Sequence, residues 1–227
     1  MGGSVDLSKK DDGIGVLTLN NPRFMNAFTG TMMIELQERI TELEDWKDGK
    51  GLIIRGAGNT FCSGSDLNAV RALSSSQDGM NMCMFMQNIL TRLMRLPLIT
   101  AALIQGKALG GGAELTTACD FRLMTPESEI RFVHKQMGLV PGWGGAARLT
   151  QILGSSPALK LLSGAVKLDP EKALHIGLVD SILSSSDDDS LREMHTWLKP
   201  YTTGPAEVIQ AHLRSERRCS SQLQVEA

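Results

Sequence analysis

Short apolar runs alternate along the chain with longer segments in which apolar side chains recur every three or four residues. The first pattern is typical of strands covered on both faces, and the second of amphipathic helices that pack on a sheet. The alternation predicts a layered α/β fold. The apolar runs lie at 15–19, 51–56, 98–105, 121–125 and 178–183, and the helical segments at 29–46 and 78–96.

The last third of the chain is divided by turn and capping residues into short helices. The acidic, serine-rich stretch 184–190 is typical of a solvated linker, so we place a domain boundary there, with a core at 1–183 and a C-terminal part at 184–227. The polar tail from Arg214 lacks apolar periodicity, and we expect it to be poorly ordered. The helices predicted in this third are 146–153, 155–163, 170–177, 191–199 and 205–213.

Composition limits the classes of partner. The 227 residues, 42% of them hydrophobic, are enough for one substantial core. Basic and acidic residues number 23 and 25 with no long basic run, so we expect neither nucleic acid nor a membrane as a partner. The N-terminus lacks a hydrophobic signal core, which favours the cytosol. The four cysteines lack the spacing of metal ligands, so we expect no metal site and reduced thiols, of which Cys62, Cys83 and Cys119 are buried as small apolar groups.

A glycine cluster follows the apolar run at 98–105. Gly110, Gly111 and Gly112 precede residues that favour a helix, which predicts a strand, a tight turn and a helix start. Free backbone amides at a helix N-terminus stabilise negative charge, and glycines let a ligand approach them. The same glycines also permit close helix packing without a ligand, so both interpretations stay open from spacing alone.

Two further loops are rich in small residues. The loop at 58–67 also follows a strand and precedes a helix-like segment, so its amides and those of the glycine cluster could converge on one ligand atom. The segment 138–145 holds several glycines and Pro141, which indicates an irregular backbone of the kind that often serves a site.

The combined motifs resemble a known family. The residues that carry the resemblance are Asn26-Ala27 after Asn21-Pro22, the loop 61–67, the run 106–115 with Cys119-Asp120, and the loop 138–145 with Arg148-Leu149. In this order, over positions 14 to 183, they are similar to the crotonase, or enoyl-CoA hydratase/isomerase, superfamily. Four motifs in order are more specific than a single glycine motif.

This resemblance implies a crotonase-like spiral of ββα units with a short C-terminal helical region. It implies an acyl-CoA thioester substrate, no cofactor apart from the coenzyme A of that substrate, and a homotrimer or hexamer. An oxyanion hole would be formed by the amides of Ser63 and Gly111. The coenzyme A would be held by Met25, Asn26, Ala27, Ser65, Asp66 and Leu67, together with Gly110.

The acids and bases separate the members of the superfamily. A typical hydratase carries one glutamate in the GGG-x-E motif and a second four residues before the glycine of the G-x-x-P-G loop. Glu114 matches the first, but His134 stands at the second position. Hydration needs a matched acid and base, whereas decarboxylation needs enolate stabilisation and no base.

Longer stretches at 122–128 and 132–135 resemble the superfamily members that decarboxylate ethylmalonyl-CoA. That resemblance implies a metal-free, cytosolic carbon–carbon lyase. It would convert ethylmalonyl-CoA to butyryl-CoA, with methylmalonyl-CoA as a secondary substrate, as metabolite repair in fatty acid metabolism.

The roles of the candidate side chains have alternatives. Glu114 would orient the substrate or relay a proton to the enolate, and His134 would face the departing carboxylate or be a bonded core histidine. Trp143 would wall the acyl pocket or only pack. A weak hydratase or isomerase using Glu114, and a non-catalytic acyl-CoA-binding subunit, are the competing functions. Because the superfamily continues with further helices, we expect a shortened or alternative C-terminus that weakens assembly.

Overall fold

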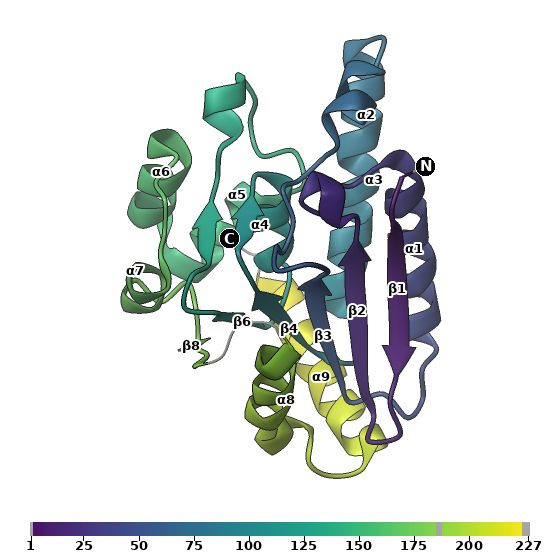
Figure 1. Cartoon of the computed structure of the whole chain (residues 1–227). Helices are drawn as coiled ribbons and strands as arrows, with labels where there is room; N and C mark the ends of the chain where they lie inside the picture. The colour runs from purple at the N-terminus through teal and green to yellow at the C-terminus, as the bar shows by residue number, and fades with distance from the viewer. Residues whose placement is uncertain (1, 185–187, 224–227) are drawn as a thin grey trace.

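The computed structural model describes residues 2–184 and 188–223 and has a mixed six-stranded sheet at its centre (Figure 1). The strand order is β1-β2-β3-β4-β6-β8, and only the β1–β2 pair is antiparallel. A second, two-stranded parallel sheet pairs β5 with β7. The strands are β1 (Ser4–Lys9), β2 (Ile14–Asn20), β3 (Gly51–Gly56), β4 (Ile99–Ile104), β5 (Lys107–Leu109), β6 (Phe121–Met124), β7 (Glu129–Arg131) and β8 (Ser181–Ile182).

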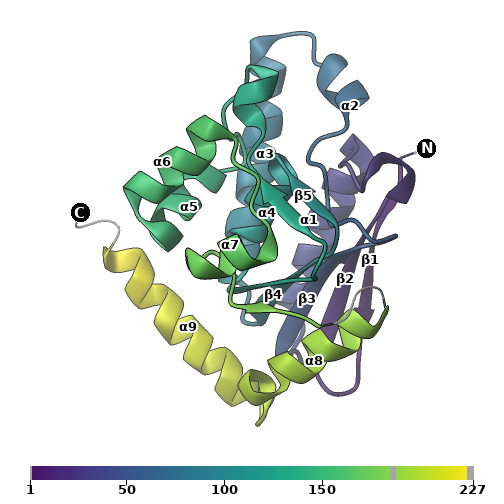
Figure 2. The same cartoon turned by 60° about the vertical axis from the view of Figure 1, so that its left-hand side comes forward.

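Helices surround both sheets, and Figure 2 shows the same arrangement turned by 60°. The α-helices are α1 (Gly30–Glu44), α2 (Leu67–Arg71), α3 (Ser76–Arg95), α4 (Gly111–Thr116), α5 (Gly145–Leu153), α6 (Ser155–Gly164), α7 (Pro170–His175), α8 (Asp188–Thr202) and α9 (Ala206–Leu223). Two short 3-10 helices are η1 (Pro22–Phe24) and η2 (His134–Met137). The α/β architecture predicted from the apolar pattern is confirmed.

The main core lies between the large sheet and helices α1 and α3. Thr29 caps α1 by accepting a hydrogen bond from the Met32 amide, and the helix buries the apolar positions that its periodicity predicts, including Leu36 and Ile40. These side chains join one apolar cluster with strand residues such as Leu17 and Ile54. Burial on this scale supplies most of the stability that holds the site loops in place.

Helix α8 covers the other face of the sheet. Met194 and Leu198 are fully buried against Ile53, Leu103 and Leu123, so that these strands are covered on both faces, as their apolar composition predicts. In Figure 1, α8 and α9 lie at the end of the molecule away from α2. The division of the chain at residue 184 stays a prediction.

The structure corrects several expectations about elements. Strands β1, β5 and β7 were not predicted, because they are short or lie at sheet edges with exposed polar positions. The expectation of a poorly ordered tail from Arg214 is wrong as far as Leu223, where α9 ends. Helix α8 begins at Asp188, within the predicted linker. Residues 185–187 of that linker and 224–227 of the tail lie outside the described residues.

Helix α9 is fixed to the core by the side chain of Gln210. Its Nε2 lies 3.1, 3.0 and 2.8 Å from the carbonyl oxygens of Trp46, Lys47 and Gly49. Further along α9, Arg217 donates to the Leu98 carbonyl and pairs with Asp120. The contacts that hold the last turns of α9 are polar, so they leave no trace in the apolar periodicity of the sequence. The helix predicted from that periodicity therefore ended too early. Within residues 2–184 and 188–223, no helix is long and apolar enough to cross a membrane.

Replacing Gln210 by alanine is expected to lower the free energy of unfolding by about 1–3 kcal/mol, because buried carbonyls lose their donor. Chemical denaturation measures this change. Gln151→Ala, at an exposed position of α5, is the matched control and should leave the unfolding free energy within about 0.5 kcal/mol of the parent. Equal stability of the two variants would contradict the anchoring role of Gln210.

Candidate active site

The loop after β3 runs beside strand β5. The Cys62 amide donates to the Lys107 carbonyl at 3.0 Å, and the Leu109 amide donates to the Cys62 carbonyl at 2.9 Å. On its other side, this loop pairs with the segment before α1 through an isolated bridge between Phe28 and Ser65. The two small-residue loops predicted to converge therefore do meet.

Glycines allow the close approach of these loops. A Cβ atom at Gly112 would lie 2.1 Å from the Cys62 carbonyl oxygen, which no side chain could tolerate without backbone movement. At Gly64, where φ is +97°, a Cβ atom would lie 2.9 Å from the Gly111 amide nitrogen. The first residues of α4 are thus held against the 62–64 backbone, and the glycine cluster serves packing here.

The backbone amides differ in their availability. The Ser63 amide donates to the Met25 carbonyl at 2.9 Å, so the expectation that it is a free oxyanion donor is wrong. The Ser65 amide and the Gly111 amide, at the start of α4, have no acceptor within the described part of the chain. Two free amides therefore lie on the two loops that Gly64 brings together, and one stands at a helix N-terminus, where the dipole favours negative charge.

Glu114 is the buried acid behind these amides. Its side chain is 1% exposed and lies in the first turn of α4. Oε2 accepts hydrogen bonds from the backbone amides of Trp143 at 2.9 Å and Gly145 at 2.7 Å, while Oε1 lies 2.9 Å from His134 Nε2. These bonds join α4, η2 and the start of α5 around one carboxylate, and they compensate its removal from water.

Arg148 supports the same network from α5. Its guanidinium is buried and donates to the Glu114 and Trp143 carbonyls and to the Thr117 hydroxyl. Burial lowers the pKa of Arg148, and the Glu114 carboxylate opposes that shift. The sequence placed Arg148 within a motif without giving it a role, because its partners come from α4 and from the loop before α5.

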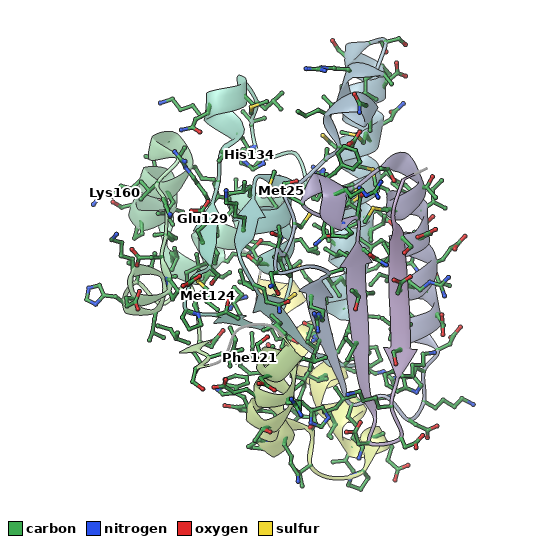
Figure 3. All side chains as sticks on the ribbon, viewed as in Figure 1. Met25, Phe121, Met124, Glu129, His134 and Lys160 are labelled. Atoms are coloured by element: carbon green, nitrogen blue, oxygen red, sulfur yellow. The ribbon has the colours of Figure 1, made fainter. Side chains whose placement is uncertain are left out.

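His134 begins η2, and its ring lies beside the glycine turn. A Cβ atom at Gly110 would lie 3.9 Å from His134 Nε2, and the side chain is 11% exposed. Nε2 pairs with Glu114, whereas the buried Nδ1 has no hydrogen-bond partner among the described residues. The structure thus brings Glu114 and His134 together, and Figure 3 labels His134 in the upper part of the molecule.

Trp143 closes one side of the helix start. A Cβ atom at Gly111 would lie 2.7 Å from its ring, and the ring packs edge-on against Phe28 with centroids 5.7 Å apart. At 3% exposure, Trp143 is a core side chain whose backbone amide also holds Glu114. Packing is the role that these contacts support.

The segment 25–27 and the loop 61–67 lie next to each other, as predicted. Met25 and Asn26 adopt left-handed backbone angles, with φ of 49° and 53°. Asn26 is fully buried and its Nδ2 donates to the Ala57 and Thr60 carbonyls, so its side chain shapes the loops and does not face a ligand. Met25 is 44% exposed, and Ala27 is buried.

The remaining predicted binding residues divide in the same way. Asp66 caps α2 by accepting from the Asn68 and Ala69 amides, whereas Leu67 is 53% exposed. The Gly110 amide donates to the Arg131 carbonyl and has a φ of +52°, which the turn into α4 requires. In these two segments the apolar Met25 and Leu67 are exposed, whereas the polar Asn26 and Asp66 are held by hydrogen bonds.

The thiols differ in environment. Cys62 and Cys119 are buried as expected, and burial raises the pKa of each thiol to about 12. Cys83 on α3 is only partly buried, contrary to expectation, and burial and the Glu114 charge raise its pKa. In the described ranges, no group of three His, Cys, Asp or Glu side chains could hold a metal ion.

The sequence model of the enoyl-CoA hydratase/isomerase family matches residues 9–225. Among curated relatives, a Gallus gallus protein named ethylmalonyl-CoA decarboxylase is 78% identical over 211 residues, covering 92% of this chain and 71% of that protein. The Xenopus tropicalis and Homo sapiens proteins of the same name are 70% and 65% identical, covering 92% and 94% of this chain and 70% of each relative.

Solved structures show the same fold. An enoyl-CoA hydratase from Bacillus anthracis superposes with a TM-score of 0.88 at 22% identity, covering 98% of this chain and 87% of that one. One from Polaromonas sp. JS666 gives 0.86 at 23% identity, covering 96% and 85%. With the family match over nearly the whole chain, the protein belongs to the enoyl-CoA hydratase/isomerase family and has the crotonase fold.

Proposed function

We propose that this protein decarboxylates ethylmalonyl-CoA to butyryl-CoA, and methylmalonyl-CoA less well, as a metabolite-repair lyase. The relatives named ethylmalonyl-CoA decarboxylase, at 63–78% identity, support this substrate. The structural observation that carries the proposal is the pairing of Glu114 with His134 beside the free Gly111 amide. His134 occupies the place where a hydratase would need a second carboxylate.

The amides of Ser65 and Gly111 are the proposed oxyanion hole. Ser65 replaces Ser63 in this role, because the Ser63 amide is committed to Met25. Both donors would bind the thioester oxygen as it gains negative charge. When the bond between the α-carbon and the carboxylate breaks, its electron pair enters the enolate and CO2 leaves. One preorganised donor of this kind contributes about 3 kcal/mol to stabilising the transition state.

Coenzyme A is proposed to lie along the loops at the entrance to this site. The backbone of Met25 and Ala27, and that of Ser65 to Leu67, would contact it, and the exposed side chains of Met25 and Leu67 offer apolar contact. Asn26 and Asp66 would act by shaping these loops, as their hydrogen bonds indicate. No cofactor besides the coenzyme A of the substrate is proposed.

We also propose assembly as a homotrimer or hexamer. An apolar groove of about 640 Å³ between α6 and α7, lined by Leu161, Val166 and Ile176 among others, supports burial of this face against another subunit. Leu159, also on α6, is 64% exposed. The cytosolic location stays a prediction.

The purified protein is expected to release CO2 from ethylmalonyl-CoA faster than from methylmalonyl-CoA, and to leave the enoyl absorbance of crotonyl-CoA unchanged. CO2 release and absorbance at the enoyl band are the measurements. Ready hydration without CO2 release would contradict the proposal in favour of a hydratase. Coenzyme A binding with neither reaction would favour a binding subunit.

Gly112→Ala is expected to lower kcat/KM for decarboxylation by about 100-fold or more, the loss seen when one oxyanion donor is misplaced. The new methyl group must displace the Cys62 carbonyl, which lies 2.1 Å from its position, and so separates the two loops. Steady-state kinetics measure the change, and thermal melting shows whether the variant is folded. Gly30→Ala, with no atom within 4 Å of the added methyl, is the control and should retain full activity.

A folded Gly112→Ala variant with the parent kcat/KM would contradict the placement of the oxyanion hole between these loops. Reduced activity in the Gly30→Ala control would contradict the assignment of the loss to the contact between the two loops, because it would show that an added methyl group elsewhere also disturbs the enzyme.

A further inference from the structure

The buried Nδ1 of His134 is a polar atom that the fold leaves without a partner. It is shielded from solvent, and no donor or acceptor of the described residues reaches it. Buried polar atoms are nearly always bonded, and an exception calls for a ligand atom or a functional explanation. The other ring nitrogen, Nε2, is held by Glu114, so the orientation of the ring and the position of the unpaired Nδ1 are set.

The hydrogen bond to Glu114 determines which ring nitrogen of His134 is already occupied. Oε2 faces two backbone N–H groups, which can only donate, so this oxygen is an acceptor. When Glu114 is ionised, Oε1 is an acceptor as well, and His134 Nε2 then donates a proton to it. Nδ1 is then the one ring position whose proton can change while the bond to Glu114 persists.

The ring also stands next to the proposed oxyanion hole. Its Nε2 is 3.9 Å from the Cβ position of Gly110, the residue that precedes the free Gly111 amide. At 11% exposure, the histidine side chain reaches nearer to the site surface than the carboxylate of Glu114, which is 1% exposed. Of the paired groups, His134 is therefore the one with side-chain surface at the site.

We propose, on the basis of the decarboxylase function above, that His134 protonates the α-carbon of the enolate through Nδ1 and that Glu114 is its positioning residue. After CO2 has left, the Nδ1–H bond of the imidazolium breaks and a C–H bond forms at the α-carbon. The neutral ring then takes a proton from water. One proton is consumed for each CO2 released, and no oxidant or reductant is required.

The reverse proton transfer provides a test that needs no decarboxylation. The protein is expected to exchange an α-proton of butyryl-CoA with solvent deuterium, because the same ring, when neutral, can remove that proton. NMR of butyryl-CoA in D2O measures the exchange. In His134→Gln, the side-chain amide keeps a donor toward Glu114 and lacks Nδ1, so exchange should be about 100-fold slower or more.

His212→Gln is the matched control, since it removes an exposed histidine on α9, and its exchange rate should equal that of the parent. Thermal melting and butyryl-CoA binding verify that His134→Gln is folded and loaded. Parent-like exchange in His134→Gln would overturn the inference, and so would an absence of exchange in the parent protein. CO2 release without exchange would contradict this inference but not the decarboxylase function. Exchange without CO2 release would contradict the decarboxylase function.

Glu114→Gln tests the positioning role. The new amide oxygen must face the Trp143 and Gly145 amides, which turns its NH2 group toward His134 Nε2 and opposes the donor already there. The kcat of exchange should fall at least tenfold, while the KM for butyryl-CoA stays unchanged. A parent-like kcat, or a loss that lies entirely in KM, would contradict the positioning role.

Discussion

The buried carboxylate of Glu114 is the interaction on which the site depends. A charge with 1% exposure is tolerated only where hydrogen bonds replace its hydration, and here two backbone amides and one histidine do so. Those partners come from η2 and from the loop into α5, so the carboxylate fixes their positions relative to α4. Arg148 donates to the carbonyls of Glu114 and Trp143 and ties α5 to the same centre.

A second constraint is the contact between two backbone segments at Cys62 and Gly112. Their approach leaves no room for a side chain, so glycine is required for packing as well as for ligand access. The two interpretations of the glycine cluster that spacing left open are therefore compatible. Close packing of α4 against the loop is also what brings the free amides of Ser65 and Gly111 onto neighbouring segments.

The large elements could be predicted from the sequence because their apolar periodicity is local. Helix α1 was expected at 29–46 and spans Gly30–Glu44, and β3 was expected at its observed bounds. Strand β1 and the end of α9 were missed because they depend on edge pairing and on the contacts of Gln210 and Arg217. The contacts of Gln210 and Arg217 join residues more than a hundred positions apart and leave no local pattern.

The candidate site was predictable in its residue types but not in its bonding. Glu114 and His134 were recognised separately, and their contact depends on tertiary structure. The choice of Ser63 failed for a backbone reason. Gly64, with a φ of +97°, turns the chain between Ser63 and Ser65, so the first amide is bound to Met25 and the second is left free. Sequence alone cannot tell which amide of a loop is already satisfied.

The same bonding explains why this site favours loss of CO2 over addition of water. Hydration needs a general base and a general acid on the two carbons of a double bond, each free to exchange a proton. In this protein, Glu114 is surrounded by donors, and the position of a second carboxylate is occupied by its own partner, His134. Decarboxylation requires only that charge be stabilised at the thioester oxygen and that one proton arrive afterwards. Two free amides and one histidine with an open Nδ1 are the groups that we propose for these functions.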